Sequence, residues 1–141
     1  MTLQRHNVLI GLAGACLACS ITSALATDLS ATSKAVWDGH LQKVMAKNLD
    51  AVMADFTDAS VIVTTDKVYS GKAEVRGFIG KFIENLTPDA MKSMVMQAEV
   101  PHDNIVFTKF TVGKFKRTFI YTAEIAGDKI VTVTTTNYTA E

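Results

Sequence analysis

The chain has 141 residues, and its 14 basic and 14 acidic side chains give a net charge of zero. This length allows one domain, and the even spread of charge argues against a surface that binds nucleic acid. Both cysteines, Cys16 and Cys19, lie near the N-terminus. The remainder of the chain has no cysteine, so it cannot form a disulfide scaffold, a thiolate zinc site or the active site of a cysteine enzyme.

Residues 1–26 are typical of a secretory signal peptide. A basic region around Arg5 precedes an uncharged apolar stretch at residues 8–21, which is shorter than the ~20 residues of a membrane span. Ala24 and Ala26 then supply the small residues of a signal-peptidase site. We predict cleavage after Ala26 and export to the periplasm or the medium of a bacterium, with no membrane association afterwards. An uncleaved N-terminal anchor is the alternative.

Two helices are predicted at the start of the mature domain, residues 27–141. From Ala35 the apolar residues fall at helical spacing. The chain then bends near Asn48, and a second, shorter helix repeats the same pattern through Phe56. Each of these helices therefore has one apolar face to bury.

A strand and a third helix follow. Residues 60–65 are rich in β-branched side chains, which favour a strand, and Asp66 lies in the tight turn after it. Ser70 is placed to cap the next helix with its hydroxyl. That helix carries a continuous apolar stripe, and Pro88 ends it.

Four long strands complete the prediction. Short turns with glycine, proline or aspartate separate them, and they span residues 92–100, 105–115, 116–125 and 129–138. Because the helices come first and the strands are joined by short connections, the sequence predicts an α+β fold. The N-terminal helices would pack on one face of an antiparallel meander.

Three segments, in register along the chain, resemble SnoaL-like proteins of the NTF2-like superfamily. They are the leucine–acid passage at residues 49–59, the tyrosine-x-glycine-lysine helix start at 69–78 and the terminal hairpin at 125–130. The resemblance covers nearly all of residues 27–141 and implies a curved sheet around a cone-shaped pocket, the NTF2-like or cystatin-like cone. The superfamily includes isomerases, cyclases, hydrolases, ligand binders and assembly domains, so the fold alone does not give the function.

The resemblance also implies where catalytic residues would fall. The three roles of a steroid isomerase of this fold fall on His40, Val63 and a position near Tyr121, and a valine cannot act as the base. Asp66 could replace it only as a remote alternative, because it lies in a solvated turn. An epoxide-hydrolase set is missing too, since Phe119 and Tyr121 stand where an arginine and an aspartate would lie.

His40 is the main titratable candidate. It shares a helical face with Trp37, so we expect it to face the pocket, where it could act as a general acid or base. The favoured alternative is a half-buried histidine bonded to a backbone carbonyl or to Tyr121. His102 is expected in a solvated turn. Two separated histidines without an acidic pair do not make a metal site, and we predict neither a metal nor another cofactor.

Three functions remain open. We favour binding of a small apolar molecule in a cone pocket whose walls lack an acid and hence the known acid–base set. The second is an isomerase, cyclase or hydrolase that uses His40 and Tyr121. The third is a homodimerisation module that pairs through the exposed sheet face, where Thr132, Thr134 and Thr136 are expected. The residues expected to line the pocket are Trp37, His40, Phe78, Phe82, Phe107 and Tyr121.

Overall fold

A curved sheet carries the fold. The computed structural model describes the backbone of residues 18–139 and the side chains of residues 29–139, and within this part of the chain six strands pair in the order β2-β1-β6-β5-β4-β3. The strands are β1 (Phe56–Val63), β2 (Val68–Ser70), β3 (Met94–His102), β4 (Ile105–Val112), β5 (Arg117–Ala126) and β6 (Lys129–Thr139). The α+β class and the antiparallel meander of the last four strands are confirmed.

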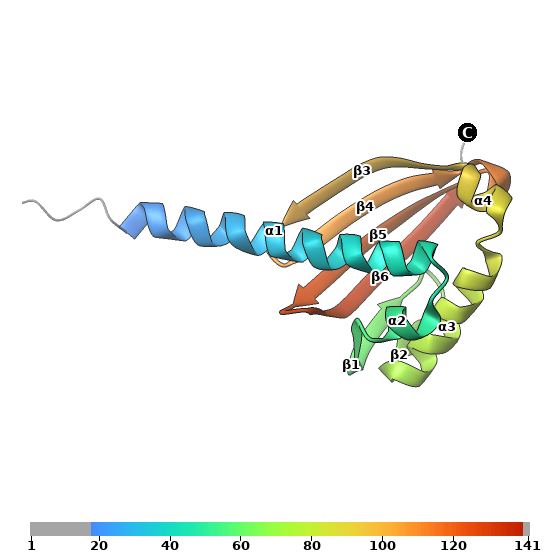
Figure 1. Cartoon of the computed structure of the whole chain (residues 1–141), viewed down its shortest axis with the longest axis horizontal. Coiled ribbons are helices and arrows are strands. Elements are labelled where there is room, and N and C mark those ends of the chain that lie inside the picture. The colour runs from blue at the N-terminus through green and yellow to red at the C-terminus, as the bar shows by residue number, and fades with distance from the viewer. Residues whose placement is uncertain (1–17, 140–141) are drawn as a thin grey trace, which may run out of the picture.

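Helices cover one face of the sheet (Figure 1). Helix α1 lies across β3, β4 and β5, and helix α3 packs on β1 and β2. The helical elements are α1 (Ala18–Met45), α2 (Leu49–Met53), α3 (Gly71–Asn85), α4 (Pro88–Lys92) and the 3-10 turn η1 (Gly113–Phe115). The core lies between the two long helices and the concave face of the sheet.

The return of the chain to β1 is the main feature that the sequence pattern does not predict. Strand β6 pairs with β1 in parallel, with Ile62 beside Val133. This pairing places the first strand between β2 and β6, under α3. It also brings Asp55, which directly precedes β1, close to Ile130, whose backbone N–H donates to the carbonyl of Asp55 at 2.8 Å.

Two local predictions are wrong. The second helix ends at Met53 and Phe56 begins β1, because the backbone at Phe56 pairs with Ile130 of β6 instead of continuing the helix. The Ser70 hydroxyl makes no capping hydrogen bond. The Ser70 backbone N–H instead donates to Oε2 of Glu74 at 3.0 Å, so the Glu74 carboxylate stabilises the first turn of the helix.

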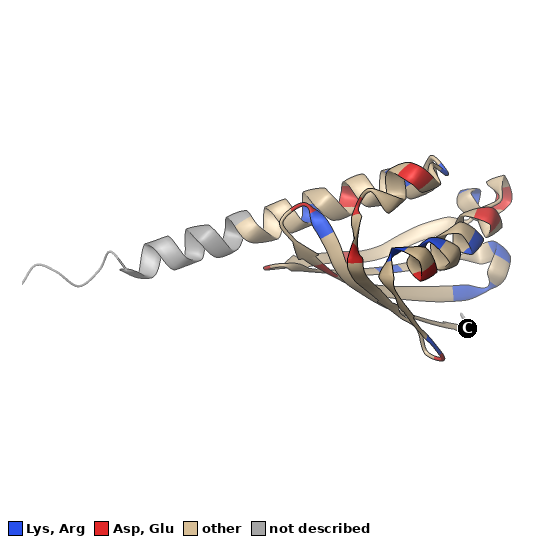
Figure 2. Cartoon of the chain, turned by 90° about the horizontal axis from the view of Figure 1, so that it is seen from below, with Lys and Arg blue, Asp and Glu red and all other residues tan. Residues whose placement is uncertain are grey.

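The predicted signal peptide remains a prediction. Residues 1–17 lie outside the described part of the chain, and α1 runs continuously through Ala26. Among the described helices, none combines the length and the apolar character that crossing a membrane requires. Figure 2 shows basic and acidic residues interspersed over the described helices and turns, in keeping with the balanced composition.

Candidate functional site

Two adjoining hollows lie between the helices and the sheet. The larger, here the outer cleft, has a volume of about 530 Å³, and the smaller, here the inner pocket, has about 40 Å³. Phe78, Phe82 and Tyr121 line both hollows, so the inner pocket lies directly behind the aromatic wall of the outer cleft. The other inner residues are Trp37, His40, Leu41, Val44, Phe56, Ile62, Ile79, Phe110 and Val133.

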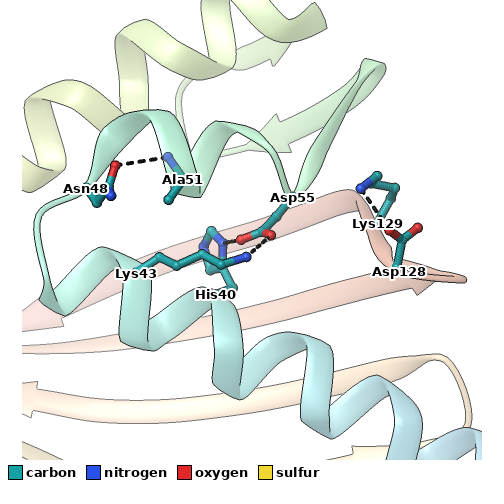
Figure 3. A network of polar contacts seen from close by, with 7 residues as sticks. All are labelled: His40, Lys43, Asn48, Ala51, Asp55, Asp128 and Lys129. Carbon is teal, nitrogen blue, oxygen red and sulfur yellow. Dashed lines mark hydrogen bonds and ion pairs between the residues drawn. The ribbon is translucent and has the colours of Figure 1, made fainter.

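A polar network stands behind one wall of the inner pocket (Figure 3). His40, on α1, is 4% exposed, and its Nδ1 lies 3.1 Å from Oδ2 of Asp55. The other oxygen of Asp55 accepts from Nζ of Lys43, one turn further along α1. Helix α1 thus supplies the histidine and the lysine, and the loop before β1 supplies the carboxylate between them.

The network keeps Asp55 ionised. Burial raises the pKa of this carboxyl, but hydrogen bonds and charge interactions with His40 and Lys43 outweigh it and hold the pKa below its usual value. An ionised carboxylate can only accept hydrogen bonds. The Nδ1 of His40 therefore carries a proton, and this N–H donates a hydrogen bond to Oδ2 of Asp55.

Aromatic rings fix the plane of the histidine. The ring of Trp37 stacks on His40 with centroids 5.2 Å apart, and Phe56 meets it edge-on at 5.4 Å. Trp37 is itself held by its indole N–H, which donates to Oγ1 of Thr108 at 2.7 Å. The imidazole is therefore held by packing as well as by Asp55.

Tyr121 lies at the junction of the two hollows. Burial raises its pKa to about 12, although a hydrogen bond with the Thr135 side chain acts in the opposite direction. The phenol is consequently neutral at physiological pH and can donate a hydrogen bond. It stacks on Phe110 at 5.5 Å and meets Phe82 edge-on at 6.4 Å.

The outer cleft combines an aromatic floor with a polar rim. Its aromatic side chains are Phe78, Phe82, Phe119 and Tyr121, together with Tyr69. Its polar residues, drawn from the β1–β2 turn, α3 and β6, are Thr64, Thr65, Asp66, Lys81, Asn85, Thr135 and Asn137. A ligand there would rest an apolar body on the rings and meet amides, hydroxyls and one charge of each sign at the rim.

The expectation that the pocket walls lack an acid is wrong. Asp66 is in the exposed turn after β1, as predicted, and accepts from the Thr64 hydroxyl at 2.8 Å, but it also lines the outer cleft. A second carboxylate, Asp55, stands directly behind His40. The predicted partners of His40, a backbone carbonyl or Tyr121, are likewise replaced by Asp55.

Most of the predicted lining residues do meet at the site, but Phe107 does not. Trp37, His40, Phe78, Phe82 and Tyr121 line one hollow or both. Phe107 is half-buried and alternates along β4 with buried residues such as Val106. Alternation places it on the opposite, convex face of the sheet.

Strand alternation also places Val63, the position expected to hold a base, outside the two hollows. Ile62 lines the inner pocket and Thr64 lines the outer cleft, so Val63 between them points to the convex face. None of these three residues can abstract a proton. The mechanism that the resemblance implies for Val63 therefore has no base on this strand.

Sequence reasoning missed Asp55 altogether. It lies 15 residues from His40 in the chain, and only the parallel pairing of β1 with β6 brings it beneath α1. The available signal was an acid directly before an apolar strand start, at Phe56. His102, by contrast, is exposed as predicted and lies 3.6 Å from its neighbour Asp103.

The remaining predicted residues lie away from the hollows. Thr132, Thr134 and Thr136 alternate on β6 with the buried Val133 and Thr135, so they face the convex side. Among the described residues, no group of three or more histidine, cysteine or acidic side chains could hold a metal ion.

Comparison with solved structures identifies the fold. No protein-family profile matches the sequence, and no curated protein matches it. An NTF-2-like protein of unknown function from Burkholderia xenovorans has 14% identity and a TM-score of 0.59, over 80% of this chain and 86% of that one. A cystatin-like fold protein from the same organism has 20% identity and a TM-score of 0.58, over 81% and 95%.

A candidate ketosteroid isomerase from Kribbella flavida is also similar, with 10% identity and a TM-score of 0.60 over 78% of this chain and 80% of that one. The chain thus has the NTF2-like, cystatin-like fold that the resemblance implies. At such low identities, the likeness concerns the fold and leaves the chemistry to the site.

Proposed function

We propose that this protein is an exported domain that binds a small, largely apolar molecule in the outer cleft. The observation that carries the proposal is the cleft itself, about 530 Å³ with an aromatic floor. Binding sites for small molecules typically have ~300–1,000 Å³, apolar walls and a few placed polar groups. The cleft agrees in its volume and in its aromatic floor, and its polar groups stand at the rim.

The arrangement of the aromatic residues supports binding of a flat molecule. Phe119 stacks on Phe110 at 5.3 Å, and Phe110 stacks on Tyr121, so these rings form a continuous surface across β4 and β5. Phe82 closes the surface from α3. Rings that already pack against one another lose little conformational entropy when a ligand binds.

The test is a matched pair of variants. Protein purified after expression of the full chain would be analysed by mass spectrometry for co-purified small molecules and titrated with an apolar fluorescent dye. Phe82→Ala should weaken dye binding about tenfold or more. Phe107→Ala removes an equally half-buried ring from the convex face and should leave binding unchanged. Equal dye binding by both variants would place any ligand elsewhere and refute the proposal.

A second candidate is an acid–base enzyme of the isomerase, cyclase or hydrolase type. The observation that favours it is the His40–Asp55 pair at the inner pocket. A carboxylate that orients a histidine makes the histidine a more effective general base. Deuterium exchange into enolisable ketones, followed by NMR, would test it. His40→Ala should abolish exchange, whereas His102→Ala, at an exposed histidine, should not.

A third candidate is a homodimer through the convex face. Val100 is 54% exposed there, in a row with Phe107, Thr122 and Thr134. Sedimentation should then show a dimer that Val100→Glu dissociates. A monomer at high protein concentration would dismiss this candidate.

A further inference from the structure

The orientation of His40 has a consequence for what the inner pocket can bind. Its Nδ1 is engaged by Asp55, and none of the hydrogen bonds among the described side chains engages Nε2. No buried polar side-chain atom in this part of the chain lacks a partner, so Nε2 must reach open space. The space at this ring is the inner pocket, which His40 lines.

The charge state of Asp55 decides the polarity of Nε2. The carboxylate accepts from Lys43 through one oxygen and from His40 through the other. When its imidazole is neutral, His40 donates through Nδ1 and carries a lone pair on Nε2. In that state His40 presents a hydrogen-bond acceptor to the inner pocket, whereas a protonated ring would donate through both nitrogens.

The other polar groups around the inner pocket are Trp37 and Tyr121. The indole N–H of Trp37 is already bound by Thr108, and Tyr121 stands at the junction with the outer cleft, which it also lines. The inner pocket, at about 40 Å³, has room for one polar group, since a water needs ~10–15 Å³. The body of a ligand would lie in the outer cleft.

We infer that the Lys43–Asp55 pair holds His40 as a hydrogen-bond acceptor, so that the site selects flat apolar molecules whose inner end carries an N–H or O–H donor. This inference rests on the proposed function, since it specifies which ligands the cleft takes. In such a site the protein accepts a hydrogen bond from the ligand, whereas a site for a carbonyl compound donates one.

Two probes of the same shape test the selection. Indole carries a ring N–H where benzofuran carries a ring oxygen, and the two differ little in size. At pH 8, NMR titration of the protein should give a dissociation constant for indole about threefold to tenfold lower, the size expected for one neutral hydrogen bond. If both bind equally, the inference is overturned and the proposed function survives. If neither binds, both fail.

Asp55→Asn should change this ratio in a way that a structural defect would not. Lys43 keeps the amide oxygen on its own side, so the amide NH₂ faces Nδ1 of His40. Nδ1 then accepts, Nε2 carries the proton, and the preference for indole should vanish or invert. Asp128→Asn is the matched control, because among the described side chains this nearby exposed carboxylate forms an ion pair with Lys129 alone (Figure 3), and its loss should leave the ratio unchanged. A wild-type ratio in Asp55→Asn would contradict the inference.

The protonation of His40 can also be measured directly. Nitrogen-15 chemical shifts should report a protonated Nδ1 and an unprotonated Nε2 in the wild-type protein. His6→Gln and His102→Gln remove the other two histidines of the chain and so assign the His40 signals. A proton on Nε2 in the neutral ring would overturn the inference even if the variants failed to fold.

Discussion

The indole N–H of Trp37 donates to the hydroxyl of Thr108 at 2.7 Å, and these residues are 2% and 0% exposed. The bond joins α1 to β4 and sets how the helix lies over the sheet. Thr108→Val keeps the shape of the side chain but leaves a buried N–H without a partner. We expect a loss of about 1–3 kcal/mol in the free energy of unfolding.

Chemical denaturation measures this loss, and Thr111→Val is its control, since Thr111 is half-buried three residues further along β4. The double variant with Trp37→Phe should lose less than the sum of the single losses, because the unsatisfied N–H is gone. Strict additivity would mean that the bond does not contribute to stability.

The pKa of Asp55 makes stability depend on pH. Its folded-state pKa is lowered below the unfolded value by His40 and Lys43, against the effect of burial. A depressed carboxyl pKa contributes stability that is present above the unfolded pKa of about 4 and is lost as pH falls through the folded pKa. The wild-type free energy of unfolding should therefore fall steeply below about pH 4.

Asp55→Asn removes this contribution, so the variant should be less stable near neutral pH and its stability should change less in acid. Urea unfolding between about pH 6 and pH 3 provides the measurement. Glu84→Gln, at an exposed carboxylate on α3, should keep the wild-type pH dependence. An equally steep acid loss in Asp55→Asn would refute the explanation.

Two glycines of α3 should respond in opposite directions to alanine. Gly71 has φ +79°, and a Cβ there would lie 3.4 Å from the carbonyl oxygen of Asp58. Gly71→Ala should cost about 1–2 kcal/mol, because the left-handed conformation disfavours a Cβ. Gly77 lies in the helix with open space around it, so Gly77→Ala should stabilise the protein by up to about 1 kcal/mol. Thermal unfolding of both variants distinguishes the two effects.

Export can be tested on the full chain. Expressed in a bacterium with a periplasm, the protein should be recovered there or in the medium with Thr27 as its first residue, because the peptidase cuts after Ala26. Ala26→Phe blocks the small-residue position and should leave the chain unprocessed. Recovery of an intact N-terminus from the wild-type chain would favour the uncleaved anchor.

The sequence predicted more of the fold than of the candidate site. Helical spacing predicted α3 and the part of α1 from Ala35 onward, and strand-like runs predicted the final meander, because local periodicity follows directly from which side chains must be buried. The same reasoning placed Trp37, His40 and Tyr121 on inward faces. It misplaced Phe107, because a predicted strand gives two faces and only the pairing decides which one α1 covers.

By itself, then, the sequence determined the order of the elements, their apolar faces and the aromatic character of the site, all of which depend on near neighbours in the chain. Only the tertiary structure decided the partner of His40. The parallel pairing of β1 with β6 carries Asp55 beneath α1, and a contact between residues far apart in the chain leaves no periodic signal. The polarity of the inner pocket depends on that contact, because a histidine accepts or donates according to what holds its other nitrogen.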